Sequence, residues 1–495
     1  MGYSMKVAFD NKKYLDLQSK AINERISKFD NKLYLEFGGK LFDDYNAARV
    51  LPGFKSNIKI ELLKKLKDKT EIIFCINAND IEKRKLRADY GITYDMDVMR
   101  LIDNLRNIGM TINSVVITLF EGQKSAEIFR KKLERRNIKT YIHTYTKGYP
   151  TDVNLIVSDE GYGANPYIET TKPLVVVTAP GPNSGKLGTS LSQLYHEYKR
   201  GVKAGYAKFE TFPIWNLPLK HPVNISYEAA TADLKDTNLI DYFHLDEYNE
   251  VAVNYNRDLE VFPILSDILK KITGECIYKS PTDMGVNKVG FCITDDDAVK
   301  KASKEEINRR YYKALCDYKK GLLDEEVPKK IKVLMNELNI DESEREVIKI
   351  ALKKHDKEGV PVIALKLHNG VIVTGKNTKI MTAGASLIIN SIKKLAHIKD
   401  EIYLLSPVVL EPLKKLKEEL YENSLLNIQD VLLGLSIAAA TNPTAELALS
   451  KLNLLKFTDA HSTHFIPEAD ESMFRTLKIN ITSEAEFYSQ NLYFD

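Results

Sequence analysis

The stretch from residue 173 to residue 201 restricts the fold of this chain more than any other. Residues 174–177 (L-V-V-V) form a short apolar run of the kind found in strands buried on both faces. The next segment, P-G-P-N-S-G at 180–185, combines glycine and proline in a way that neither helix nor strand tolerates. Leucines at 187, 191 and 194 then recur at helical spacing, and Gly201 ends the pattern. The sequence therefore predicts a strand, a glycine loop and a helix.

A glycine loop that leads into a helix is typical of a phosphate site, because unpaired backbone N–H groups and the helix dipole both favour an anion. The loop resembles the P-loop pattern G-x-x-x-x-G-K-[ST], but Pro180 replaces the first glycine and Leu187 replaces the hydroxyl that would hold Mg²⁺. The interpretation is an anion site, with ATP or GTP as candidate ligands. The alternative is a tight turn with a solvated lysine. The candidate phosphate ligands are Gly181, Asn183, Ser184, Gly185, Lys186 and Thr189.

Two other strand ends could contribute to the same site. Gly38, Gly39 and Lys40 follow the apolar run at 33–37, and ligands of α/β sheets bind beyond the carboxyl ends of strands. Residues 153–158 (V-N-L-I-V-S) are expected to form a strand that ends at Asp159, a candidate ligand for Mg²⁺. A plain turn with a charged cluster is the alternative for the first feature. For the second feature, the alternative is a strand that simply ends in polar residues.

Strands and helices alternate with short connections over the first 204 residues. Apolar runs at 71–77, 114–120 and 139–145 are expected to be strands, and helical patterns occupy 58–66, 95–108 and 125–136. Such alternation predicts an α/β fold with a mostly parallel, Rossmann-like or P-loop-like sheet.

Three further segments follow. Residues 205–297 are rich in aromatic residues, proline and amides, and they are expected to be irregular and to form the substrate side or a lid of the α/β domain at 1–204. His221 and Asp233 in this segment are candidate catalytic bases. Inter-domain packing, with a structural His221, is the alternative. Residues 298–357 are strongly charged and helix-forming, which predicts a helical subdomain.

Residues 358–495 are expected to form an α+β C-terminal domain. It begins with a hairpin whose turn is Asn369-Gly370, and helical segments at 383–397, 407 onward and 428–440 follow. His461 and His464 lie near acidic residues in a stretch that is expected to be a loop. The pair could ligate Zn²⁺, but the H-E-x-x-H spacing is missing, so a polar loop is favoured over a zinc site.

Composition excludes several classes of function. The net charge is +3 with both signs mixed along the chain, which indicates neither a nucleic-acid nor a membrane surface. No apolar run is long enough to span a membrane, and no apolar leader is seen. Four scattered cysteines without a C-x-x-C motif predict free thiols and a cytoplasmic protein. A symmetric homo-oligomer is the default for a chain of 495 residues.

Several stretches together resemble one family. They are K-L-Y-L-E-F-G-G-K-L-F-D-D-Y, K-G-Y-P-T-D-V-N-L-I-V-S-D-E-G-Y-G, T-A-P-G-P-N-S-G-K, F-E-T-F-P-I-W-N-L-P-L-K-H-P-V-N and D-A-H-S-T-H-F, spread over essentially the whole chain. The chain is similar to a conserved bacterial family of unknown function, DUF 1846. The resemblance implies a large cytoplasmic protein with a Rossmann-like or P-loop-like N-terminal part and a separate C-terminal part, and it implies no activity.

The residues themselves support two functional hypotheses. The first is an enzyme, such as a phosphotransferase or nucleotide hydrolase, that acts on a nucleotide or a phosphorylated metabolite held by the 180–189 loop. Its catalysis would rest mainly on positioning and charge neutralisation. The second is a non-catalytic protein that binds a metabolite or assembles with copies of itself, and it predicts binding without turnover.

Overall fold

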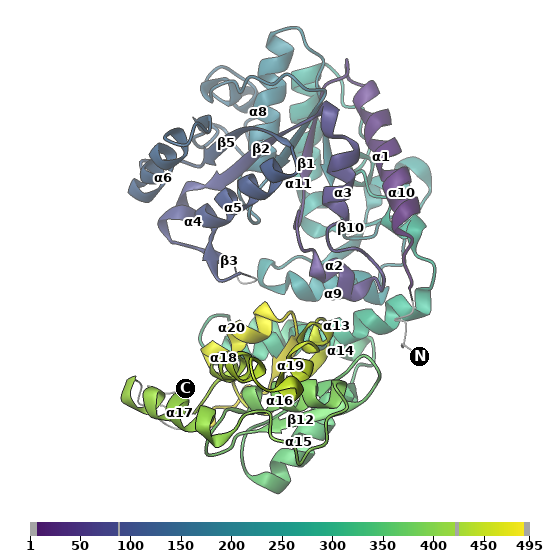
Figure 1. Ribbon diagram of the computed structural model, residues 1–495. Coiled ribbons are helices and arrows are strands. Elements are labelled where there is room, and N and C mark those ends of the chain that lie inside the picture. The colour runs from purple at the N-terminus through teal and green to yellow at the C-terminus, as the bar shows by residue number, and fades with distance from the viewer. Residues whose placement is uncertain (1–6, 88–89, 421–424, 490–495) are drawn as a thin grey trace. The chain divides into compact units, whose positions relative to one another are not determined.

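The computed structural model describes residues 7–87, 90–420 and 425–489, and the chain divides into two compact units between Ser303 and Lys304 (Figure 1). We call the part up to Ser303 the N-terminal unit and the part from Lys304 onward the C-terminal unit. The helix α13 (Asp296–Lys319) runs through this division. Each unit has its own sheet and its own apolar core.

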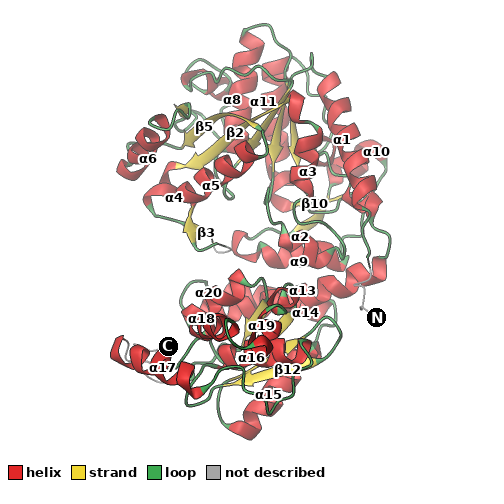
Figure 2. Ribbon diagram, in the orientation of Figure 1, coloured by secondary structure: helices red, strands yellow, loops and turns green. Residues whose placement is uncertain are grey.

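The N-terminal unit is built on a six-stranded sheet in which every neighbouring pair is parallel (Figure 2). Its order is β6-β5-β2-β7-β1-β8. The strands are β1 (Leu33–Phe37), β2 (Thr70–Asn77), β5 (Thr111–Thr118), β6 (Thr140–Ile142), β7 (Leu174–Thr178) and β8 (Gly205–Phe209). The predicted α/β class is confirmed, and the run at 174–177 is a central strand that is buried throughout.

Helices cover both faces of this sheet. Because side chains alternate between the two faces along each strand, a single strand contributes to an apolar core on each face. Leu33 and Leu35 of β1 belong to a core that includes helices α1, α3, α5 and α6, whereas Tyr34 belongs to a second core with α8 and α11. The helices named are α1 (Asn11–Ser27), α3 (Ile58–Lys65), α5 (Tyr94–Asn107), α6 (Lys124–Glu134), α8 (Lys186–Lys199) and α11 (Asn256–Thr273).

The connections from the adjacent strands β2 and β7 leave toward opposite faces. From β2 the chain passes through α4 (Ala78–Glu82) and α5, in the first core, to β5. From β7 it passes through α8, in the second core, to β8 on the far side of β1. In open α/β sheets the crevice at such a reversal, outside the carboxyl ends of the strands, is where ligands bind. The glycine loop follows β7 at this position.

Residues 153–158 are not the expected strand. Residues Val153–Ile156 form the short helix α7, because the side chain of Asp152 accepts a hydrogen bond from the Leu155 N–H at 3.0 Å and caps the turn. Asp159 therefore does not end a buried strand, and the local argument for a magnesium ligand at this position is lost. Asp152 could have indicated a helix start in the sequence, because aspartate side chains bond to nearby backbone N–H groups in competition with strand formation.

The segment at 205–297 contains more regular structure than the sequence predicts. It begins with β8, the edge strand of the sheet, and ends at the start of α13. Between them lie α9 (Pro222–Ala230), β9 (Asn238–Ile240), α10 (Tyr242–Tyr248), β10 (Val253–Tyr255), α11 and α12 (Pro281–Met284). Strands β9 and β10 pair as a small antiparallel sheet. Only the connections between these elements are irregular.

The C-terminal unit has a mixed four-stranded sheet in the order β12-β11-β13-β14. The predicted hairpin is confirmed as β11 (Val362–Lys366) and β12 (Ile372–Lys376), with Gly370 at a φ of +84° in the turn. The stretch around His461 is not the expected loop, because β13 (Asp459–Ser462) lies between β11 and β14 (Asn480–Ser483). Predicted helices are confirmed as α14 (Glu326–Glu337), α15 (Glu346–Glu358), α16 (Ala383–Leu395), α17 (Pro407–Leu420) and α18 (Ile428–Ala439). Helix α19 (Pro443–Leu449) comes next along the chain, and α20 (Glu468–Thr476) follows β13.

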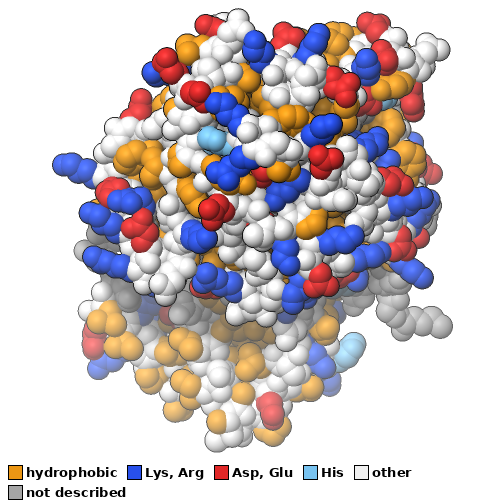
Figure 3. Space-filling view, turned by 90° about the horizontal axis from the view of Figure 1, so that it is seen from above, with side chains coloured by type: hydrophobic (Ala, Val, Ile, Leu, Met, Phe, Trp, Pro, Cys, Tyr) orange, Lys and Arg blue, Asp and Glu red, His pale blue; other side chains and the backbone are white. Residues whose placement is uncertain are grey.

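The surface carries mixed charge. On the face that Figure 3 shows, basic and acidic side chains are interspersed, in keeping with a net charge of only +3. Within the described ranges, no helix combines the length and the apolar character that a membrane crossing requires.

Candidate functional site

The glycine loop has a conformation that other residues would resist. Gly185 precedes α8 as its N-cap with a φ of +79°, and Asn183 also has a positive φ, +54°. A Cβ atom on Gly185 would lie 2.7 Å from the Cβ of Thr118, which is closer than two carbon atoms approach. Glycine is therefore required at position 185 both by the backbone angle and by the close packing against β5.

Three neighbouring side chains hold the carbonyl groups of the loop. The Thr118 hydroxyl donates to the Ser184 carbonyl at 2.8 Å. The Asn77 amide donates to the Asn183 carbonyl at 3.2 Å. Arg87, in the short strand β3 (Leu86–Arg87), donates to the Pro180 carbonyl at 3.0 Å. The loop is thus anchored to the ends of β2 and β5 and to β3.

The first turn of α8 leaves its N–H groups available. No side chain caps the helix, and its first internal bond at this end runs from the Thr189 N–H to the Gly185 carbonyl at 2.9 Å. Within the described part of the chain, the N–H groups of Lys186, Leu187 and Gly188 have no acceptor. These donors and the helix dipole together form the arrangement that binds anions in proteins.

A cavity of about 370 Å³ adjoins this turn, which is within the usual range for small-molecule sites. Its walls come from the start of α8, the ends of β5 and β6, the 162–165 turn and one side of α11. Apolar side chains dominate the α11 and α8 walls, and tyrosines and threonines follow the strand ends. The lining residues are Thr118, Leu119, His143, Thr144, Tyr145, Thr146, Tyr149, Tyr162, Asn165, Gly185, Leu187, Gly188, Thr189, Leu191, Val261, Ile264, Leu265 and Ile268.

His143 is the titratable group of this cavity that the sequence analysis missed. It follows β6, only 3% of it is exposed, and its Nε2 has no hydrogen-bond partner among the described residues. Burial lowers its pKa to about 4, against the opposing effect of a hydrogen bond with the Pro166 backbone. The imidazole is therefore neutral at pH 7, and no described residue donates to its buried Nε2.

The side chain of Lys186 is directed to the other side of the loop. Its Nζ lies 3.7 Å from Oε1 of Glu36 in β1, and the Tyr206 hydroxyl donates to Oε2 of Glu36 at 2.8 Å. Beyond this pair, Lys208 in β8 contacts both carboxylate oxygens of Asp258 at 2.8 Å. An acid and a base thus lie together beside the anion-binding turn.

Gly38, Gly39 and Lys40 lie at the same edge of the sheet as the glycine loop. β1 is the neighbour of β7, so both strands end in the same crevice. The Gly38 N–H donates to the Phe209 carbonyl at 2.8 Å, and its own carbonyl accepts from Lys59 at 3.3 Å. None of the three residues lines the cavity beside α8.

The structure does not bring the two candidate bases to this cavity. His221 is the N-cap of α9: its Nδ1 accepts from the Val223 N–H at 3.2 Å, and its Nε2 lies 2.9 Å from Asp296. Burial lowers the pKa of His221, although Asp296 acts in the opposite direction. Asp233 is exposed in a short 3₁₀ helix. Neither residue lines the cavity, so the structure supports a structural role for His221.

The candidate metal ligands are also separated from the loop. Asp159 forms an ion pair with Lys199 and accepts from Tyr195, near the last turn of α8, whereas Gly185 lies before its first. A helix of this length spans about 21 Å. His461 lies in the C-terminal unit, with its ring nitrogens 2.9 Å from Thr482 and 3.1 Å from Glu484. Among the described residues, no group of three or more His, Cys, Asp or Glu side chains is placed to hold a metal ion.

Some of the site residues that the sequence analysis missed could have been predicted, and others could not. Asn77 and Thr118 are polar residues at the ends of buried apolar runs, so the carboxyl-end rule that selected Gly38 could have selected them. Arg87 and His143 gave no such signal, because only the folded chain brings them to the loop and the cavity.

Comparison with known proteins gives one consistent result. The family described as "Domain of unknown function DUF1846, N-terminal" matches residues 7–339, and its C-terminal counterpart matches residues 343–493. A protein of Clostridium botulinum named UPF0371 protein is 58% identical over 502 residues, covering 99% of this chain and 100% of the relative. A UPF0371 protein of Clostridium tetani is 57% identical over the same shares. The chain therefore belongs to the DUF1846 family of proteins of unknown function.

Proposed function

We propose that the N-terminal unit binds a phosphorylated small molecule whose body is apolar or aromatic. The observation that supports this most is the meeting of two features: three N–H groups without acceptors at the start of α8, and a cavity of about 370 Å³ that shares Leu187 and Gly188 with that turn. The phosphate would accept from the N–H groups, and the body of the ligand would occupy the cavity.

The lining favours a nucleotide over a sugar phosphate. Leu187, Leu191 and the α11 side chains offer an apolar surface, and a sugar would leave most of its hydroxyl groups without partners there. A base or another flat group would lie against Leu265 and Tyr162. Because Asp159 lies near the other end of α8, we assign the phosphate charge to the N–H groups and assign no metal to Asp159.

Turnover of the ligand would depend on the charged pair beside the loop. Lys186 begins α8 and its Nζ lies 3.7 Å from Glu36, and both side chains are mostly buried. In an enzyme, Glu36→Gln should abolish phosphate release from ATP or GTP while the ligand still binds, because the amide keeps the shape and the bond to Tyr206. In a non-catalytic binding protein, no release is measured with either form.

Variants at Gly188 test the binding proposal. A Cβ atom at this position would meet nothing within 4 Å, so a side chain there enters open space without disturbing the fold. Gly188→Ala should leave binding nearly unchanged and stabilise the helix by up to about 1 kcal/mol. Gly188→Leu should fill part of the cavity and weaken binding at least about tenfold. The measurement is the thermal shift of the full chain with ATP, GTP or coenzyme A, each with and without Mg²⁺, where ligand at a hundred times Kd stabilises by about 2.7 kcal/mol.

Gly188→Pro tests the contact with the phosphate separately from the contact with the body of the ligand. It removes one N–H group that has no acceptor within the described residues, and position 188 is the third of its helix. The chain already tolerates Pro328 at the third position of α14. Loss of one donor to a phosphate should weaken binding roughly tenfold. Equal binding by the native, Gly188→Leu and Gly188→Pro proteins, or no shift with any of the three ligands, would reject the proposed site.

A further inference from the structure

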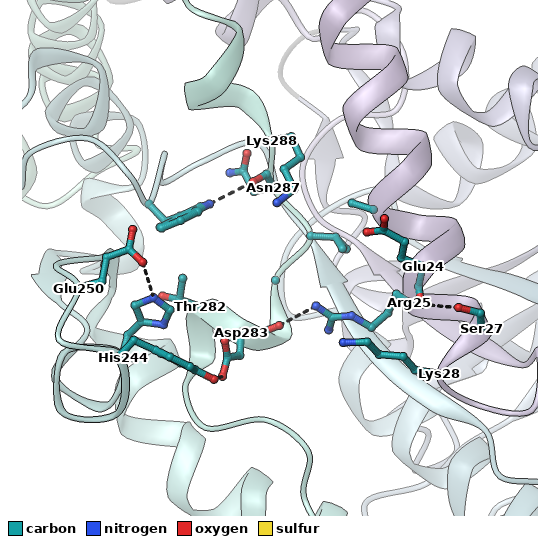
Figure 4. A pocket seen from close by; sticks show the side chains of 15 residues that line it. Glu24, Arg25, Ser27, Lys28, His244, Glu250, Thr282, Asp283, Asn287 and Lys288 are labelled. Atoms are coloured by element: carbon teal, nitrogen blue, oxygen red, sulfur yellow. Dashed lines mark hydrogen bonds and ion pairs between the residues drawn. The ribbon is translucent and has the colours of Figure 1, made fainter.

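A second and larger cavity, of about 640 Å³, lies elsewhere in the N-terminal unit (Figure 4). One wall is formed by the last turns of α1 and by residues 285–288. The facing wall comes from α10 and α12, and Trp215 also lines the cavity. None of its lining residues belongs to the cavity beside α8, so a ligand in this cavity would be independent of the phosphorylated ligand proposed above.

Three cationic side chains on the first wall lack a carboxylate partner. They are Arg25 in the last turn of α1, Lys28 directly after that helix, and Lys288, and within the described residues none of them forms an ion pair. Arg25 donates through Nη2 to the Asp283 carbonyl at 2.8 Å, and its guanidinium carbon lies 5.1 Å from the centre of the Tyr278 ring. Lys28 and Lys288 are at least partly exposed, so this wall presents two cations that an anionic group in the cavity can contact.

The facing wall presents acidic and aromatic groups. Glu250 is well exposed beside His244, and in Figure 4 both lie across the cavity from Lys28 and Lys288. One carboxylate oxygen of Asp283 on this wall is already occupied by the Tyr248 hydroxyl at 2.7 Å, which leaves Glu250 as the more available acid. Trp215 lines the same side and donates to the Asn287 carbonyl at 3.0 Å.

We propose that this cavity binds a dipolar ligand of the amino-acid or short-peptide class. The carboxylate of the ligand would contact Lys28 and Lys288, and its ammonium group would contact Glu250 beside the Trp215 ring. An anion meets the strongest available donors on the first wall. A cation next to an indole ring and a carboxylate gains from both. A purely anionic ligand would make no favourable contact with Glu250 on the facing wall.

The chain contains one tryptophan, so its fluorescence reports on this cavity directly. The probe is trialanine, titrated into the full chain, with N-acetyl-trialanine and trialanine amide as forms that lack the ammonium or the carboxylate charge. Trialanine should change the Trp215 emission saturably. Each blocked form should bind about tenfold more weakly, as expected for the loss of one charged hydrogen bond.

Variants assign each end of the peptide to a wall. In Glu250→Gln the difference between trialanine and its N-acetyl form should disappear, and in the double variant Lys28→Gln/Lys288→Gln the difference between trialanine and its amide should disappear. Lys20→Gln is the matched control: Lys20 is an exposed lysine of α1 that does not line the cavity, and its loss should change neither difference. All these side chains are at least partly exposed, so the variants should fold.

Three results would overturn the assignment. The first is the absence of any saturable change in Trp215 emission with trialanine at millimolar concentration. The second is an equal response to trialanine and to both blocked forms, and the third is a response to inorganic phosphate but not to trialanine. Each would mean that the two charged walls do not act together on one ligand.

Discussion

Replacing Asp97 with alanine is expected to lower the free energy of unfolding by about 3–5 kcal/mol, as in other buried ion pairs that lose one partner. Asp97 is fully buried in α5. It accepts from Arg87 at 2.7 Å through one oxygen and from Arg100 at 2.7 and 2.9 Å through the other. Arg87 is also buried, so the variant leaves a guanidinium in the interior without its carboxylate. Chemical denaturation of the full chain would measure the loss.

The same substitution should reach the candidate site, because Arg87 also donates to the Pro180 carbonyl of the glycine loop. We therefore expect weaker binding of any ligand that uses the first turn of α8, in addition to lower stability. Asp103→Ala is the matched control on the same helix, since Asp103 is exposed, and its effect should remain within about 0.5 kcal/mol. If Asp97→Ala were as stable as Asp103→Ala, the buried pair would not be a structural support of the loop.

The central strands and the glycine loop could be predicted because their signals are local. The run at 174–177 is β-branched and apolar along its length, and such a run is stable mainly as a buried strand. The loop after it is fixed by Gly185, whose positive φ excludes most other residues. The Asn369-Gly370 turn acts in the same way for the hairpin of the C-terminal unit.

The remaining features depend on contacts between distant segments. Residues 153–158 are apolar enough for a strand, but Asp152 caps a short helix at this place. The edge of the sheet beside β1 is formed by β8. β13 contains polar residues such as His461 and Ser462, and it is a strand because β11 and β14 pair with it on both sides. The partners of Asp159 and His221 are Lys199 and Asp296, residues 40 and 75 positions away along the chain, and no spacing rule connects them.

The second large effect is on the pH dependence of stability, and His143 is its source. The pKa of His143 is about 4 in the folded chain, because the ring is buried, against 6.5 for an ordinary histidine. Between these values the unfolded chain binds more protons than the folded one, so stability falls as the pH decreases from about 6.5 to about 4 and is fully retained above 6.5. The full difference corresponds to roughly 3 kcal/mol.

His143→Gln should remove this contribution, since glutamine does not titrate. Its free energy of unfolding should therefore depend less steeply on pH between 6.5 and 4 than that of the native chain. Burial also lowers the pKa values of His221 and His461, so both proteins still lose stability in acid, and only the difference between the two curves belongs to His143. His368→Gln is the matched control, because it replaces an exposed histidine with the same residue. Parallel curves for the native and His143→Gln proteins would mean that water or a ligand reaches Nε2 and allows the ring to be charged inside the fold.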